Sequence, residues 1–253
     1  MPFESHDEKM IMDLMNKIDV LAIGAHPDDI ELGISGTILK LIDGGKKVGL
    51  CDLTMGELGT RGSGELRLKE AEMARMVLGA DFRVNLKMAD GFFEVSKNNQ
   101  IKIIEVIRAC KPDIVLCNAL SDRHPDHGRG AELQKTACFL SGLRRIETHS
   151  NGLRQSEWRP RMVLHYIQDH FMKPDIVVDV TPYWERRMES VMAYSSQFYD
   201  PKSNEPQTAI SSQEFLKNQE GRGLQIGRYI GAKYGEGLIS ERPLGIHQIT
   251  DLI

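Results

Sequence analysis

Short apolar runs alternate along this chain with longer amphipathic stretches. The first run, IDVLAIG at 18–24, is almost continuously apolar, as in a parallel strand buried on both faces. Similar runs predict strands at 48–53, 83–88, 113–117, 162–167 and 175–180. Apolar residues at helical spacing predict helices at 33–43, 65–78, 98–110, 126–143, 182–194 and 211–233.

This rhythm of strands and helices predicts an α/β fold, a Rossmann-like, mostly parallel sheet with helices on both faces. We expect a single domain over 1–253, because single α/β domains often reach this length. The glycine-rich segment 54–64 and the polar segment 199–207 are predicted to be loops. No G-x-G-x-x-G motif follows the first strand, so a dinucleotide site is disfavoured.

Composition narrows the classes of function. The net charge is -4, and the sequence has no basic stripe of the kind that nucleic-acid binding requires. No apolar run approaches the ~20 residues of a membrane span, and the N-terminal segment lacks the apolar core of a signal peptide. We therefore expect a cytoplasmic protein that binds neither nucleic acid nor a membrane. The four cysteines form no C-x-x-C pair and are expected to be reduced, buried thiols.

Ionisable residues are concentrated directly after the first predicted strand, in the sequence AHPDDIE. The carboxyl end of a parallel strand faces the ligand crevice of an open α/β sheet. Pro27 favours an extended conformation at His26. A turn at this proline would let His26 and Asp29 converge while Asp28 points elsewhere.

A second concentration, DRHPDH at 122–127, follows the predicted strand at 113–117. Its two histidines, His124 and His127, flank a helix start at Pro125. In a parallel sheet both clusters face the same edge. Either cluster alone has the composition of an ordinary turn, but two such clusters after two strands indicate a metal site.

The two clusters together offer a catalytic zinc site. One histidine and one aspartate from the first cluster, with one histidine from the second, form a His2Asp set that leaves a position open to water. Asp28 is then a spare carboxylate that accepts the proton of this water, and His124 is a spare imidazole for the oxyanion or the leaving group. Iron, cobalt and manganese suit the same ligands, so the sequence leaves the metal open.

These residues resemble the motifs of the LmbE-like, or PIG-L, de-N-acetylases. The resemblance rests on AHPDDIELGISGT at 25–37 and SDRHPDH at 121–127, and it extends over most of the chain to SERPLGI near the C-terminus. Within the family the chain looks most like the bacillithiol-pathway deacetylases, which act on N-acetylglucosaminyl-malate. That finer resemblance rests on GELGTRGS at 56–63, YSSQF at 194–198, YGEG and ERPLG.

The resemblance implies a role for each site residue. Three residues would bind one zinc ion, namely His26, Asp29 and His127. Asp28 would be the general base, and His124 would stabilise the oxyanion or protonate the departing amine. Arg61 would contact the substrate, and Tyr194 would place a phenol close to the substrate carbonyl.

The family further implies a Rossmann-like fold and a homo-oligomer, for which a hexamer is one form. The expected function is zinc-dependent removal of the N-acetyl group from an N-acetylglucosamine conjugate. Two alternatives stay open: another amino-sugar conjugate or short amide as substrate, and a non-catalytic Rossmann-like module that binds a metal or nucleotide. The division of work between His124 and Tyr194 is also open.

Overall fold

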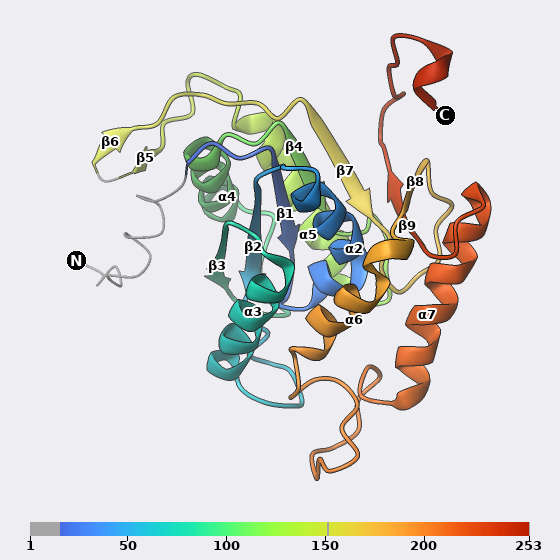
Figure 1. The fold of residues 1–253 in the computed structure, drawn as a ribbon. Helices are drawn as coiled ribbons and strands as arrows, with labels where there is room; N and C mark the ends of the chain where they lie inside the picture. The colour runs from blue at the N-terminus through green and yellow to red at the C-terminus, as the bar shows by residue number, and fades with distance from the viewer. Residues whose placement is uncertain (1–15, 151, 253) are drawn as a thin grey trace.

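A computed structural model describes residues 16–150 and 152–252 of the chain (Figure 1). Its main sheet has the strand order β3-β2-β1-β4-β7-β9-β8. The strands are β1 (Val20–Gly24), β2 (Val48–Thr54), β3 (Phe82–Met88), β4 (Ile114–Cys117), β7 (Met162–Tyr166), β8 (Ile176–Asp179) and β9 (Gly235–Ile239). Two short strands, β5 (His149–Ser150) and β6 (Leu153–Arg154), form a separate antiparallel pair.

The helices are α2 (Asp29–Asp43), α3 (Gly64–Leu78), α4 (Lys97–Cys110), α5 (Pro125–Leu140), α6 (Trp184–Met192) and α7 (Gln213–Gly227). Short 3-10 turns occur at Thr181–Tyr183, Arg228–Ile230 and Ile249–Leu252. None of the helices in the described ranges is long and apolar enough to cross a membrane. Segment 1–15, for which the sequence predicts no signal peptide, lies outside the described residues.

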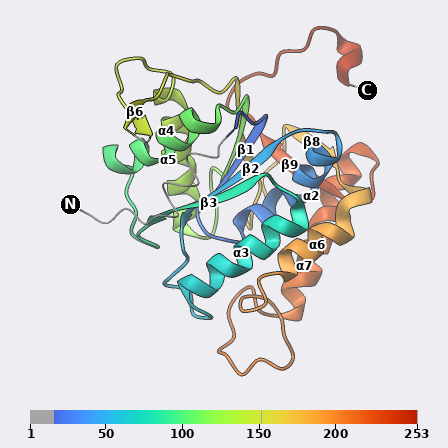
Figure 2. The same ribbon diagram turned by 60° about the vertical axis from the view of Figure 1, so that its left-hand side comes forward.

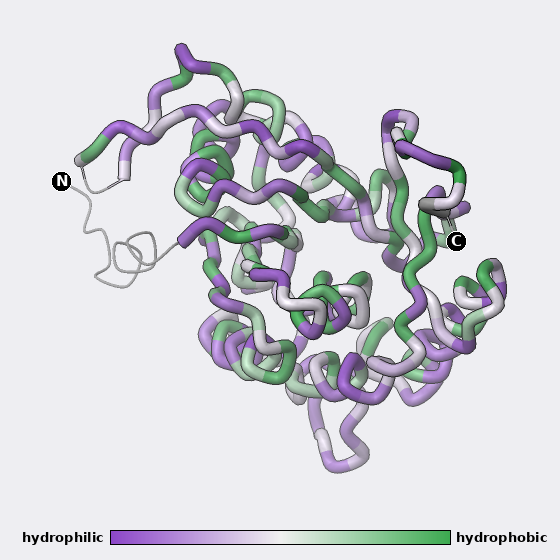
Figure 3. Tube along the Cα trace, turned by 45° about the horizontal axis from the view of Figure 1, so that its top comes forward, coloured by the Kyte–Doolittle hydropathy of each residue, from purple (hydrophilic) through white to green (hydrophobic). Residues whose placement is uncertain are grey.

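Successive side chains of a strand point to opposite faces of the sheet, and β1 feeds two cores in this way. Leu21 and Ile23 belong to the core that includes α4 and α5 residues. Val20 and Ala22 belong to the core that includes α2 residues on the other face. Helices therefore cover both faces (Figure 2), and hydrophobic and hydrophilic residues alternate along these helices (Figure 3). The predicted α/β fold is confirmed.

The order of the strands places the two ionisable clusters side by side. β1 pairs in parallel with β2 on one side and with β4 on the other. The chain thus moves outward from β1 to β3 and then returns to β4, which makes the boundary of β1 and β4 a topological switch point. Open α/β sheets bind their ligands at this boundary. The clusters after β1 and β4 flank it.

One strand of the sheet, β9, has no counterpart among the predicted elements. Its sequence GEGLI contains two glycines, which weaken a strand pattern. The glycines have a packing reason, since a Cβ on Gly235 would lie 2.8 Å from the Cα of Gly227 and one on Gly237 would lie 2.8 Å from Ile167 Cδ1. β9 runs antiparallel to both β7 and β8, so the sheet is mostly but not wholly parallel.

A buried ion pair between residues of β9 and α6 contacts the backbone in the middle of α2. Glu236 on β9 accepts hydrogen bonds from the backbone N–H groups of Gly36 (2.9 Å) and Thr37 (2.6 Å). Arg187 on α6 lies 3.2 Å from the same carboxylate and donates to the carbonyl of Leu32. Main-chain groups inside a helix normally pair with one another, so this ion pair supplements the hydrogen bonding of α2 about two turns after Asp29.

All four cysteines are buried, and none forms a disulfide. Their burial as free thiols agrees with the small hydrophobic role that the sequence predicts.

Candidate active site

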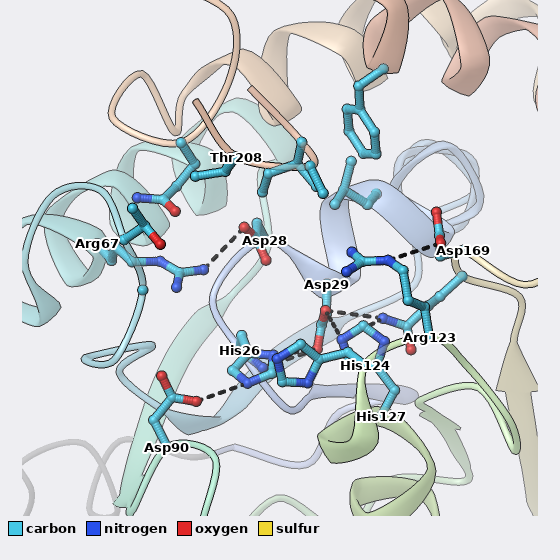
Figure 4. Close-up of a pocket in the computed structure, with 18 of the residues that line it drawn as sticks. His26, Asp28, Asp29, Arg67, Asp90, Arg123, His124, His127, Asp169 and Thr208 are labelled. Atoms are coloured by element: carbon cyan, nitrogen blue, oxygen red, sulfur yellow. Dashed lines mark hydrogen bonds and ion pairs between the residues drawn. The ribbon is translucent and has the colours of Figure 1, made fainter. Parts of the chain in front are cut away.

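A cavity of about 380 Å³ opens at the carboxyl ends of β1 and β4 (Figure 4). The segments after these two strands supply its histidines together with Asp28 and Asp29, while Asp90 follows β3 and Asp169 follows β7. Segment 208–210 with α7 supplies the opposite wall. The residues that line it are His26, Asp28, Asp29, Leu32, Leu58, Gly59, Thr60, Arg67, Asp90, Gly91, Arg123, His124, His127, Gln168, Asp169, Gln197, Thr208, Ala209, Ile210, Phe215, Gln219 and Arg222.

Asp29 lies at the centre of this arrangement as the first residue of α2. Its Oδ2 accepts hydrogen bonds from the backbone N–H of His26 (3.0 Å) and from Asn118 Nδ2 (3.0 Å). Its Oδ1 lies 3.0 Å from both Gln168 Nε2 and His127 Nε2. Burial alone would raise the pKa of this carboxyl, but the charge of His127 and these hydrogen bonds hold the pKa well below its usual range. Asp29 is therefore an anion of fixed orientation.

The side-chain amide of Asn118, which orients Asp29, has hydrogen-bond partners at both its nitrogen and its oxygen. Its Nδ2 also donates to Gln168 Oε1 (2.9 Å), and its Oδ1 accepts from Gln134 Nε2 (2.7 Å). Gln134 Oε1 in turn accepts from the backbone N–H of Asn118 (2.9 Å). A buried polar network of this kind specifies one geometry only when every member has a partner, as these amides have.

The imidazole of His26 lies between Asp29 on one side and the carboxylates of Asp90 and Asp126 on the other. Its Nδ1 lies 3.7 Å from Asp29 Oδ2. Its Nε2 lies 3.0 Å from Asp90 Oδ1 and 3.2 Å from Asp126 Oδ2. Burial disfavours charge on the imidazole, but the hydrogen bonds to Asp126, Asp29 and Asp90 outweigh it and raise the pKa of His26 well above its usual value.

His127 is supported in the same way on the other side of Asp29. Its Nδ1 lies 2.7 Å from Asp122 Oδ2, while its Nε2 faces Asp29. Burial lowers the pKa of His127, but the charge of Asp29 and the hydrogen bond to Asp122 raise it to about 9. The imidazole is thus held with one nitrogen on a carboxylate and the other at the site centre.

His124 has a different environment from the other two histidines. It caps the N-terminus of α5, where its Nδ1 accepts a hydrogen bond from the backbone N–H of Asp126 (3.2 Å). Burial and the charges of His26 and His127 lower its pKa. A neutral imidazole that accepts at Nδ1 carries its proton on Nε2, so His124 is a donor toward the cavity.

Asp28 lines the cavity beside the central carboxylate. Its backbone has φ 104, a left-handed conformation that is rare outside glycine and that separates its side chain from that of Asp29. Arg67 on α3 reaches across to it, with Nη2 3.0 Å from Asp28 Oδ2. Burial raises the pKa of Asp28 to about 7, and the charge of Arg67 opposes this rise.

The donor set fits a divalent metal ion. Two groups of ligand atoms in the described residues are close enough to share an ion, namely His26 with His124 and His127, and His26 with Asp90 and Asp126. Metal-bound histidines usually have their second nitrogen on a carboxylate, and both His26 and His127 show this arrangement. Nε2 of His26 and Nδ1 of His127 have such partners, and Asp29 lies between the two imidazoles, 3.7 Å from His26 Nδ1 and 3.0 Å from His127 Nε2.

The structure places two of the predicted site residues outside the lining of the cavity. Arg61 does not line the cavity; its guanidinium donates to main-chain carbonyls of the 198–206 segment. Tyr194 is fully buried in a core with Ala71 and Phe198, and its hydroxyl donates to Glu31 Oε2 (3.2 Å).

Several residues of the site were not singled out from the sequence. Asp90 follows β3 and Gln168 follows β7, so both were open to the same reasoning that identified the clusters after β1 and β4. Asp122 and Asp126 stand inside the quoted motif. Arg67, by contrast, reaches the cavity from the outer helix α3, and its place depends on how that helix packs.

Comparison with known proteins gives a consistent set of relatives. Residues 21–138 match the sequence profile named PIG-L, described as GlcNAc-PI de-N-acetylase. A diacetylchitobiose deacetylase of Thermococcus kodakarensis is 29% identical over 231 residues, which cover 87% of this chain and 81% of that protein. YaiS of Escherichia coli, an uncharacterised deacetylase, is 30% identical over 138 residues, or 52% of this chain and 74% of that protein.

The fold also matches a solved structure closely. The crystal structure of the conserved protein TT1542 from Thermus thermophilus has a TM-score of 0.79 and 30% identity to the chain. The match covers 90% of this chain and 97% of that one.

Proposed function

Because the chain belongs to the PIG-L family of de-N-acetylases, we propose that it hydrolyses the N-acetyl amide of an N-acetylglucosamine conjugate. The resemblance drawn from the two clusters is confirmed at the level of the family. Membership in this family favours an enzyme over the non-catalytic module that the sequence left open. The observation that carries the proposal is the juxtaposition, in one cavity, of Asp28 with the His26, Asp29 and His127 group.

We assign the metal to His26, Asp29 and His127, with zinc as the ion that suits these nitrogen and oxygen donors. A bound zinc ion supplies polarisation of the acetamide carbonyl and lowers the pKa of a water ligand to ~7. Asp126 accepts from Gly91 N (2.8 Å) and Arg129 Nη1 (2.8 Å) and contacts Nε2 of His26 (3.2 Å), which places it behind that imidazole in our assignment. Asp90 and Asp126 therefore orient His26 in this proposal.

Asp28 is the general base. Its carboxylate accepts a proton from the attacking water, and the resulting hydroxide adds to the carbonyl carbon. Arg67 holds the carboxylate at 3.0 Å and so fixes the direction of proton transfer. A base works best when its pKa lies near the working pH, and burial places the pKa of Asp28 at about 7.

His124 stabilises the negative oxygen of the tetrahedral intermediate. Its Nε2–H is the donor that remains after Nδ1 has accepted from Asp126 N. The carbon–nitrogen bond then breaks, the amine takes back the proton that Asp28 holds, and acetate leaves. In this scheme Tyr194 and Arg61 contact no reacting atom.

For the rest of the substrate we propose N-acetylglucosaminyl-malate. The support is the resemblance to bacillithiol-pathway deacetylases, together with Arg123 and Arg222, two cations that line the cavity. Diacetylchitobiose is the second candidate, because a relative from Thermococcus kodakarensis is named for that activity.

Acetate release by zinc-loaded protein tests these proposals. The panel is N-acetylglucosaminyl-malate, diacetylchitobiose and plain N-acetylglucosamine, with zinc-loaded Asp28→Asn protein as control. Release from the malate conjugate at the highest kcat/KM supports the finer assignment, whereas preference for diacetylchitobiose replaces it. Absence of release from all three contradicts the proposed activity.

A further inference from the structure

The wall of the cavity across from the metal-binding group comes from a loop that projects from the molecule. Segment 199–210 joins α6 to α7 and extends away from the sheet (orange, Figures 1 and 2). Most of its residues up to 207 are exposed. Its last residues, Thr208, Ala209 and Ile210, line the cavity, and Thr208 lies on the far side of Asp28 from the histidines (Figure 4). An exposed loop therefore forms part of the binding surface.

Arg61 joins the two ends of this loop. Its Nη1 donates to the carbonyl of Phe198 (3.3 Å), just before the loop. Its Nη2 and Nε donate to the carbonyls of Glu205 (3.2 Å) and Pro206 (2.7 Å), just before the residues of the wall. The guanidinium is a planar fork with five N–H donors, which suits a side chain that must hold several carbonyls at once.

The neighbours of Arg61 reinforce the same attachment. Its carbonyl accepts from Gln197 Nε2 (2.9 Å), and Gln197 itself lines the cavity. Glu70 on α3 accepts from the backbone N–H of Ser196 (2.7 Å) and from both serine hydroxyls of the YSSQF motif, Ser195 (3.1 Å) and Ser196 (2.7 Å). The motif that the sequence analysis singled out thus anchors the start of the loop, and Arg61 anchors its end.

We propose that Arg61 is a specificity-determining positioning residue, which holds the loop 199–210 so that its end forms the binding wall for the part of the substrate remote from the acetamide. This inference rests on the proposed de-N-acetylase function. The acetamide must lie beside Asp28 and the metal-binding group, so the wall meets the aglycone. Contacts with a remote part of a substrate discriminate between substrates through kcat/KM. Arg61 therefore selects the conjugate without touching it.

The test compares Arg61→Ala with Arg61→Lys and Glu205→Gln. Glu205→Gln is the matched control because Arg61 uses the main-chain carbonyl of Glu205, which this variant keeps. Three quantities are measured: zinc content, amide hydrogen exchange in 199–210, and kcat/KM for the conjugates and for plain N-acetylglucosamine. Arg61→Lys retains the charge with fewer donors and keeps the test decisive if the alanine variant does not fold.

For Arg61→Ala we expect wild-type zinc content, faster exchange in 199–210, and a loss of about tenfold or more in kcat/KM for the preferred conjugate. The loss lies mainly in KM, and plain N-acetylglucosamine, which lacks the aglycone, is affected far less. Arg61→Lys falls between the wild type and Arg61→Ala, and Glu205→Gln matches the wild type. Unchanged exchange in 199–210, or an equal loss of kcat for every substrate, overturns the proposal. Absence of turnover by the wild type would instead defeat the proposed function, and unchanged exchange would still overturn the role of Arg61.

Discussion

Arg67 Nη2 lies 3.0 Å from Asp28 Oδ2, so a side chain from α3 holds the proposed base of a site otherwise built from strand ends. We expect Asp28→Asn to lower kcat by about 10²–10⁴-fold, the usual contribution of a general base, and to keep the metal. Asparagine tolerates the left-handed backbone found at this position, with φ 104. Steady-state kinetics and metal analysis of the same preparation check this expectation, and a variant without metal would instead identify Asp28 as a ligand.

Removal of a ligand should differ from removal of the carboxylate behind it. His127→Ala should lose stoichiometric zinc, because the imidazole supplies one of three protein ligands. Asp122→Asn should bind zinc about 10–100-fold more weakly, since carboxylates behind metal-bound histidines usually have effects of this size. Competition with a chromogenic chelator measures both.

A zinc ion bound by the second ligand group, His26 with Asp90 and Asp126, would give the opposite effects of substitution on zinc binding. If this group held the ion, Asp90→Asn would lose zinc and His127→Ala would retain it. We expect the reverse order of zinc affinities for these two variants.

Tyr194→Phe distinguishes a structural hydroxyl from a catalytic one. The hydroxyl donates to buried Glu31 (3.2 Å), so its removal should reduce the free energy of unfolding by about 1–3 kcal/mol, as for other hydrogen bonds to charged groups. We expect kcat within about twofold of the wild type, because hydroxyl loss outside the reacting group changes no transition-state contact. Urea unfolding and kinetics give both values. A large fall in kcat with unchanged stability would instead support the catalytic role that the family resemblance implies.

The ion pair in α2 should affect stability strongly. Glu236→Gln leaves the buried guanidinium of Arg187 without its anion, and breaking a buried pair typically costs ~3–5 kcal/mol. The double variant Arg187→Met/Glu236→Gln should recover part of this loss because it no longer buries an unpaired charge. Denaturant unfolding of the single and double variants measures the difference. Equal stability of the two variants would contradict the expectation.

His165 should make the fold more sensitive to acid. Burial lowers its pKa and outweighs the opposing effects of the Asn118 carbonyl, 2.8 Å from Nδ1, and of the Glu241 carboxylate, 3.6 Å from Nε2. A group whose pKa falls on folding stabilises the folded state above its unfolded pKa of ~6.5, and this contribution is lost as the pH falls through the lower, folded value. We expect the melting temperature of His165→Gln to fall less steeply than that of the wild type between pH 7 and pH 5.

Much of the fold could be predicted from the sequence, because parallel strands that are buried on both faces have continuous apolar sequences. Strand β9 was not predicted. Its two glycines are required by close packing against Gly227 and Ile167, and glycine weakens the sequence pattern of a strand. The start of α2 was predicted four residues late, at 33 instead of Asp29, because its first turn consists of ionisable and apolar residues whose positions are set by the site.

The sequence predicts that the segments after β1 and β4 lie at one edge of the sheet, and the structure places His26 and His127 together there, each beside Asp29. Arg61 and Tyr194 do not line the cavity, and the sequence could not show this because a motif gives the position of a residue along the chain but not the direction of its side chain. Tyr194 turns into a core with Phe198, and Arg61 turns to a loop far along the chain. Both outcomes depend on packing between elements separated by more than a hundred positions. The homo-oligomer, with a hexamer as one form, stays a prediction from the resemblance.

The hydrogen bond from the backbone of α2 to the Glu236 carboxylate connects residues that are 200 positions apart in the sequence. During synthesis α2 leaves the ribosome long before β9, so the amides of Gly36 and Thr37 receive this partner only after the chain between them has been made, a separation of 200 positions for Gly36. Contacts of such long sequence separation are also the slowest to form in folding. The helix that carries Asp29 is therefore completed by a strand that is made much later, which makes assembly of the proposed metal site depend on synthesis of β9.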